Sequence, residues 1–217
     1  MLPGDRDLVP RSNGMATHAW LEWASFTGEK RVRDFALLSL DRGWTQCWQA
    51  PFGMLRRDAF GEIARVPQLT DQVEMGRACV LGAHLAGRAV DLARAEQVGE
   101  LIEKIFADPR RGCWRTQAAA DKNGRIRNAA CDPRENARAA LFFCELASVT
   151  GHPRWREAAK RTISKYAPDL GKAALDSGDW ALAVRALGGA ELSPRPEWKA
   201  PAELPKTPRS KSYGKKR

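Results

Sequence analysis

The 217-residue sequence lacks an uninterrupted apolar run of the roughly 18 residues that a transmembrane helix needs. It also lacks a phosphate-binding glycine loop, a histidine pair at H-x-x-x-H spacing and a serine-hydrolase nucleophile motif. The best signatures of nucleotide, zinc-dependent and serine hydrolases are therefore missing. Residues 1–14 carry several charges and no apolar segment like that of a secretory signal. We expect a protein without a membrane partner, a metal site or a cofactor.

Cysteine is scarce as well, and no two of the five cysteines form a C-x-x-C pair. An odd number without such a pair argues against a disulfide framework and against a zinc site. We therefore predict a reduced, cytoplasmic protein whose cysteines mostly fill the core. Cys113 and Cys131 flank one long connection, where a redox role is conceivable but has no support from the sequence.

The positive charge is concentrated at one end of the chain. Of the net charge of +10, the segment from Lys199 to Arg217 contributes seven basic residues against one acid, Glu203. We predict that residues 191–217 form a disordered basic tail, which would bind nucleic acid only weakly and in a salt-dependent manner. Residues 1–14 are predicted to be a disordered segment, and residues 15–190 a single domain.

What the chain does contain is a repeated helical hairpin. Three units each consist of an apolar helix, a short turn and an amphipathic helix, with turns at Thr27-Gly28, Ala86-Gly87 and Thr150-Gly151. Apolar residues recur at i, i+3, i+4, i+7 in the second helix of each unit, which is the spacing of one helical face. A shorter fourth unit is expected between residues 168 and 187.

The first helix of each unit has little polar surface, so we expect it to be covered on most sides. This pattern predicts an all-α protein with inner apolar helices and outer amphipathic helices. The long connections, residues 44–69 and 107–131, each run from an outer helix to the next inner helix. Both should open at the same end of the molecule, and connections of this length are often functional.

This arrangement resembles an (α/α) toroid of the six-hairpin glycosidase and N-acylglucosamine 2-epimerase type. It is most similar to the C-terminal toroid of thioredoxin-domain-containing proteins, although no thioredoxin domain is present. The resemblance rests on residues 69–76, 106–114 and 136–155. It implies a carbohydrate-binding or carbohydrate-processing protein. A closed toroid needs about twice this chain, so we expect a partial, half-length toroid of three to four hairpins, which a homodimer or a partner chain could complete.

Two inner helices begin with carboxylates at the same spacing, Asp71 with Glu74 and Asp132 with Glu135. Such pairs can divide the roles of general acid and general base in sugar chemistry, which makes all four catalytic candidates. The competing interpretation is helix capping, because an aspartate followed three residues later by a glutamate is an aspartate version of the capping box, and Pro133 occupies the favoured first helical position. Capping is the better supported of the two.

Substrate-binding candidates come from the resemblance and from the aromatic residues. Asp71, Gln72 and Asn136 match the family pattern, whereas residues 132–135 depart from it. Trp44, Trp48 and Trp114 lie in the long connections and could stack on sugar rings, although packing is the commoner role of a large aromatic side chain. The three histidines lie near the turns and are expected to be structural or exposed. A non-enzymatic helical scaffold that binds another protein is the alternative function.

Overall fold

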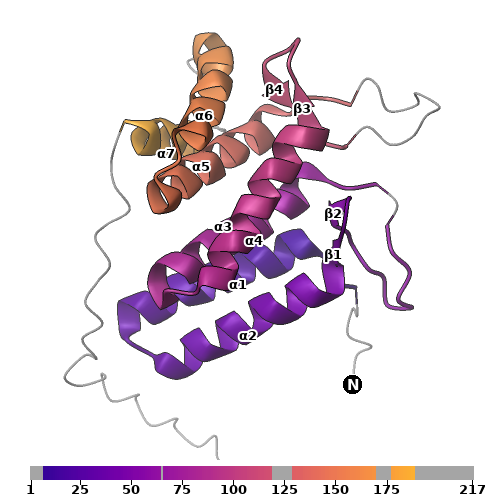
Figure 1. Cartoon of the computed structure of the whole chain (residues 1–217), viewed down its shortest axis with the longest axis vertical. Coiled ribbons are helices and arrows are strands. Elements are labelled where there is room, and N and C mark those ends of the chain that lie inside the picture. Colours follow the sequence, from indigo (N-terminus) through magenta and orange to yellow (C-terminus); the bar gives the residue numbers. More distant parts are fainter. Residues whose placement is uncertain (1–6, 65, 119–128, 170–176, 189–217) are drawn as a thin grey trace, which may run out of the picture.

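The computed structural model describes residues 7–64, 66–118, 129–169 and 177–188 (Figure 1). Within them the chain forms α1 (Pro10–Thr27), α2 (Lys30–Cys47), α3 (Leu69–Ala86), α4 (Ala89–Leu101), α5 (Pro133–Thr150), α6 (Pro153–Tyr166) and α7 (Ser177–Leu187). A π-helical turn, Ile102–Phe106, continues α4, and a 3-10 turn, Ala167–Asp169, follows α6.

The helices form an arc of two layers. Helices α1, α3, α5 and α7 pack side by side in that order as the inner layer, and α2, α4 and α6 each pack against the preceding inner helix (Figure 1). This is the predicted partial toroid of three hairpins and part of a fourth. The all-α prediction is confirmed, because the only strands in the described residues belong to two short hairpins.

Glycine ends the inner helix of each complete unit, as the sequence predicts. Gly28, Gly87 and Gly151 have φ values of 77°, 66° and 70°, and the N–H of each donates to the carbonyl four residues earlier. A left-handed residue at this position satisfies a helix-terminal carbonyl and reverses the chain, and glycine adopts that conformation without steric cost. The repeated turn therefore sets the antiparallel packing of inner and outer helices.

The two long connections lie at the same end of the arc, toward the right of Figure 1. The first contains the hairpin of β1 (Trp48–Gln49) and β2 (Gly53–Met54), and the second that of β3 (Ala107–Asp108) and β4 (Cys113–Trp114). The connections also bond to each other, because the N–H of Leu69 donates to the Thr116 carbonyl at 2.9 Å. The expectation of a shared end is confirmed.

An amide side chain from the following inner helix holds each hairpin. The Gln72 side chain accepts from the Met54 N–H at 2.7 Å and donates to the Met54 carbonyl at 2.8 Å. The Asn136 side chain makes the same two bonds with Trp114, both at 2.8 Å. Because both amides are buried, these bonds satisfy polar groups that water cannot reach.

The core lies between the layers and continues under the second hairpin. Trp114 stacks on Phe143 with ring centroids 4.8 Å apart, and Phe143 in turn packs on Trp155 at 5.6 Å. All three side chains are buried. The predicted amphipathic pattern of the outer helix α6 is therefore confirmed at Trp155, Ala158, Ala159, Thr162 and Ile163, which are all buried.

Three expectations are wrong. Residues 1–14 were expected outside the fold, but α1 begins at Pro10, and Leu8 bonds to Arg57 in both directions. A disulfide was not expected, yet Cys113 and Cys131 form one, and Cys47, Cys79 and Cys144 are free and buried. The inner helices were expected to be apolar on most sides, but one side of them carries charged side chains. The predicted tail, residues 191–217, lies outside the described residues.

Candidate functional site

The charged side chains of α1, α3, α5 and α7 gather on one side of the inner layer, here called the inner face. From the end that bears the long connections it carries Arg11, Asp71 and Glu135, then Glu74, Arg138 and Asp179, then His18, Arg77 and Glu145. On α3 these residues are three positions apart, and on α5 they are three and then seven apart, which places them along one side of each helix. The inner face therefore holds three of the four predicted catalytic carboxylates: Asp71, Glu74 and Glu135.

Asp71 is buried in the first turn of α3 and has two donors. The Arg56 guanidinium donates to one carboxylate oxygen at 2.9 Å, and the Arg11 backbone N–H donates to the other at 3.1 Å. Burial raises the pKa of Asp71, and the Arg56 contact opposes part of that rise. Asp71 thus joins α1, α3 and the first long connection at a single carboxylate.

Glu135 lies in the first turn of α5, one residue before Asn136, just as Asp71 precedes Gln72. Burial, reinforced by the negative charge of Asp132, raises the pKa of Glu135 to about 7, and Asp71 adds a smaller repulsion. Its Oε2 atom is buried and has no hydrogen-bond partner among the described residues. A carboxyl group of this kind can hold a proton near neutral pH and donate it to a ligand.

This raised pKa predicts that the stability of the protein depends on pH. The folded state holds the Glu135 proton more tightly than the unfolded chain, whose usual value is 4.5, so stability should fall as the pH rises from about 4.5 to about 7. Glu135→Gln should reduce the difference in melting temperature between pH 5 and pH 8. The matched control is Glu100→Gln, at an exposed glutamate, which should keep the wild-type difference. An unchanged difference in Glu135→Gln would contradict the assignment.

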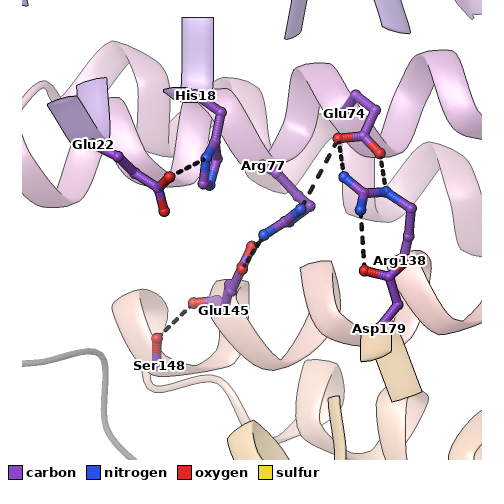
Figure 2. Close-up of polar contacts among 8 residues, drawn as sticks. All are labelled: His18, Glu22, Glu74, Arg77, Arg138, Glu145, Ser148 and Asp179. Atoms are coloured by element: carbon purple, nitrogen blue, oxygen red, sulfur yellow. Dashed lines mark hydrogen bonds and ion pairs between the residues drawn. The ribbon is translucent and has the colours of Figure 1, made fainter. Parts of the chain in front are cut away.

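Glu74 lies one helical turn further along α3 and is paired with arginines. Both of its oxygens accept from Arg138 of α5, which also donates to Asp179 of α7 at 3.1 Å (Figure 2). Arg77 approaches Glu74 within 4.0 Å and donates to both oxygens of Glu145 at 2.9 and 2.7 Å. Because only 2% of the Glu74 side chain is exposed, its charge depends on these partners. Glu74 of α3 binds Arg138 of α5 directly, and it is linked to α7 through the contact of Arg138 with Asp179. It is therefore not available as a free acid or base.

His18 is a residue of the inner face that the sequence did not single out. It was expected near a turn, but it lies in the middle of α1, where its Nδ1 is 3.7 Å from a Glu22 oxygen (Figure 2). Burial, together with the positive charges of Arg77 and Arg138, lowers its pKa to about 3. His18 is therefore a neutral imidazole at physiological pH and a weak base, because its surroundings disfavour the protonated form. Only the contacts between α1, α3 and α5 reveal this, because no local motif surrounds it.

Four of the predicted site residues serve the fold instead. The side-chain amides of Gln72 and Asn136 are bonded to the two hairpins. Trp114 is fully buried, and its indole N–H donates to Glu103 at 2.6 Å. Asp132 caps α5, since its side chain accepts from the N–H groups of Arg134 and Glu135 at 2.8 and 3.0 Å. Gln72, Asn136 and Trp114 are fully buried and do not reach a ligand in this arrangement, whereas Asp132 is half-buried and its catalytic role stays a prediction.

Trp44 and Trp48 lie against each other near the first hairpin. Their rings are stacked, with centroids 4.4 Å apart, and the Arg94 guanidinium lies 5.2 Å from the Trp44 ring centroid. Both are partly buried against the core.

A pocket of about 370 Å³ lies between residues 7–9 and the segment 56–64 of the first long connection. Its lining includes Arg56, the partner of Asp71, but neither Asp71 nor Glu135.

The described residues contain neither a metal-binding cluster nor a membrane-spanning helix. No group of three or more histidine, cysteine, aspartate and glutamate side chains in these ranges is arranged to bind a metal ion. Among the described helices, none combines the length and the apolar character required to cross a membrane.

The α/α-toroid fold of this chain is similar to the folds of several solved structures. An inactive variant of the α-1,6-mannanase of Salegentibacter sp. HEL1_6, bound to α-1,6-mannotetrose, matches with a TM-score of 0.61 at 13% identity over 73% of this chain and 47% of that chain. The cellobiose 2-epimerase of Bacillus thermoamylovorans B4167 matches with 0.68 at 10% identity over 87% and 58%. A D-mannose isomerase matches with 0.64 at 12% identity over 78% and 44%.

At such low identity these likenesses show the α/α-toroid fold alone. This chain spans less than two thirds of the length of each of these proteins. No protein-family model and no curated protein sequence matches it.

Proposed function

We propose that this protein binds and processes a carbohydrate on its inner face, at the end where the long connections meet. The observation that carries the proposal is the pair of carboxyl groups at equivalent positions of α3 and α5: Asp71, held by Arg56, and Glu135, with an unpaired buried oxygen and a pKa of about 7. Similar folds in a mannanase, an epimerase and an isomerase support sugar chemistry on this fold.

The two carboxyl groups suit different roles. Glu135 can donate its proton to a glycosidic or carbonyl oxygen, because it remains partly protonated at neutral pH. Burial raises the pKa of Asp71 and the bonded Arg56 guanidinium opposes that rise, so Asp71 suits the role of the group that accepts a proton or stabilises developing positive charge. Neutral His18, further along the same face, can exchange a hydrogen bond with a sugar hydroxyl, but its lowered pKa makes it a weak base.

The proposal predicts that turnover requires the Glu135 proton. Purified protein would be incubated with α-1,6-mannotetrose, cellobiose and D-mannose, and the products followed by NMR. Glu135→Gln should lower turnover by about 10² to 10⁴-fold while sugar binding, measured by calorimetry, changes far less. Turnover by the wild type should also decline above about pH 7, where Glu135 loses its proton.

Glu100→Gln is again the control, because Glu100 forms an exposed ion pair with Arg154 on the outer helices α4 and α6. It should keep wild-type turnover. Wild-type turnover in a folded Glu135→Gln variant would refute the catalytic assignment. If the wild type neither binds nor converts any of the three sugars, or a broader set of glycans, the carbohydrate proposal fails.

A second candidate function is a scaffold that binds a second copy of this chain or another protein. It is favoured by exposed aromatic and aliphatic side chains on the α1–α2 hairpin, which forms one edge of the arc: Trp20, Trp23, Phe26, Phe35 and Leu38. An apolar surface of this kind often marks an interface. Sedimentation would test it: a monomer at all concentrations, with no protein partner, would exclude this function.

Three finer predictions accompany the carbohydrate proposal. The relation to thioredoxin-domain-containing proteins rests on the sequence resemblance alone. The cytoplasmic location and the weak binding of nucleic acid by residues 191–217 likewise stay predictions from composition. Cell fractionation, and a salt titration with and without this segment, would test the last two.

A further inference from the structure

The disulfide between Cys113 and Cys131 joins the second hairpin to the last residue of the second long connection. Cys113 lies in β4, directly before Trp114, whose backbone N–H and carbonyl are both bound by the Asn136 side chain. Cys131 directly precedes Asp132, which caps α5. The covalent bond therefore ties the hairpin to the start of α5, a few residues from Glu135.

Further hydrogen bonds hold the segment 130–135, which contains Cys131 and the start of α5. The Thr116 N–H donates to the Ala130 carbonyl at 2.8 Å, and the Tyr166 hydroxyl of α6 donates to the Cys131 carbonyl at 3.2 Å. Asp132 in turn holds the N–H of Glu135 at 3.0 Å. The disulfide holds Cys131, and the next residue, Asp132, holds the backbone N–H of Glu135. The position of the Glu135 backbone thus depends on the disulfide through Asp132.

The first connection provides an internal comparison. Its hairpin is held by Gln72 as the second is held by Asn136, and Asp71 corresponds to Glu135. Where the second connection has Cys113 and Cys131, the first has Gly53 and Pro67, so it has no covalent link. One half of the candidate site is therefore closed by a reducible bond, and the other half is not.

We propose that Cys113–Cys131 is a redox site through which dithiol reductants loosen the first turn of α5 and so displace Glu135, leaving the Asp71 half in place. A thiolate of the reductant attacks one sulfur of the disulfide, and its second thiol completes the exchange. Two electrons and two protons pass to the protein, giving two cysteine thiols and an oxidised, disulfide form of the reductant. Partial exposure of Cys131 provides access, whereas Cys113 is buried.

The test uses the full chain before and after treatment with dithiothreitol. Denatured protein should react with iodoacetamide at three cysteines when untreated and at all five after reduction. Hydrogen exchange should then become faster by about tenfold or more at the amides of residues 134–137, because the loop constraint is lost, while the equivalent amides 70–73 in α3 keep their rates. Five reactive cysteines without reductant, or equal acceleration in α3 and α5, would overturn the proposal.

The double variant Cys113→Ser/Cys131→Ser separates reduction from other effects of dithiothreitol. It should show the fast exchange of the reduced protein without treatment and should not respond to the reductant. A response equal to that of the wild type would overturn the proposal.

The functional consequence rests on the proposed carbohydrate site: reduction should weaken sugar turnover in the wild type and leave the double variant unchanged. If no sugar is turned over in either state, the proposed function fails, while the exchange data still decide the redox site.

Discussion

Replacing Gly14 by alanine should lower the free energy of unfolding by about 3 kcal/mol, one of the two largest effects expected from a single substitution. Gly14 lies where α1 crosses α3. A Cβ atom there would be 2.5 Å from the Glu74 carbonyl carbon, 2.6 Å from its oxygen and 2.7 Å from the Met75 nitrogen. Because these are backbone atoms, no rotamer change can relieve the overlap, and the two helices must separate.

The comparison for Gly14→Ala is Gly178→Ala in α7. A Cβ atom at Gly178 meets nothing within 4 Å, and alanine favours helix over glycine, so stability should be unchanged or rise by up to about 0.5 kcal/mol. Urea unfolding followed by circular dichroism measures both variants. Similar stabilities of the two variants would show that α1 does not approach α3 as closely as described, and would remove the argument that residues 10–14 belong to the fold.

Replacing Glu74 by alanine should cost about 3 to 5 kcal/mol, because it leaves two guanidiniums without their shared carboxylate. Arg138 loses the partner of its Nε and Nη2 atoms, and Arg77 keeps only Glu145. Both arginines are mostly buried, with 24% and 11% of their side chains exposed, so water can replace little of the lost interaction. Thermal and urea unfolding of Glu74→Ala give the change.

The control is Glu100→Ala. This glutamate also pairs with an arginine of a neighbouring helix, but both side chains are more than half exposed. Its loss should cost less than about 1 kcal/mol. The double variant Glu74→Met/Arg138→Met should recover part of the stability lost in Glu74→Ala, since no uncompensated charge remains at that pair. A Glu74→Ala variant as stable as Glu100→Ala would show that the inner face is open to water.

The hairpin repeat could be predicted because it follows from local patterns in the sequence. Helical periodicity, a glycine after each inner helix and long polar connections depend on neighbours within one or two turns, and all three recur in α1 to α6. The cap of α5 at Asp132 was visible for the same reason. The start of α1 was missed because a charged, glycine-containing segment has weak helix propensity, which contacts with Asp71 and the α3 backbone override.

Only part of the candidate site could be predicted from the sequence. Asp71 and Glu135 could be proposed as acids from their position at helix starts, but their environments could not. The two donors to Asp71, the Arg56 guanidinium and the Arg11 backbone N–H, lie 15 and 60 positions away in the sequence. The burial of the unpaired Glu135 oxygen likewise depends on how the chain folds around it. His18 had no local signal at all, and Trp114 was misjudged because its burial depends on Phe143 and Glu103.

By itself the sequence determined the helices, their turns and their order in an arc, because a repeated apolar face can be buried only by stacking one hairpin on the next. The tertiary structure decided which carboxyl groups are paired, which tryptophans are buried and which two cysteines meet. These outcomes depend on distances between separate helices, and solvation and charge pairing at each side chain follow from those distances.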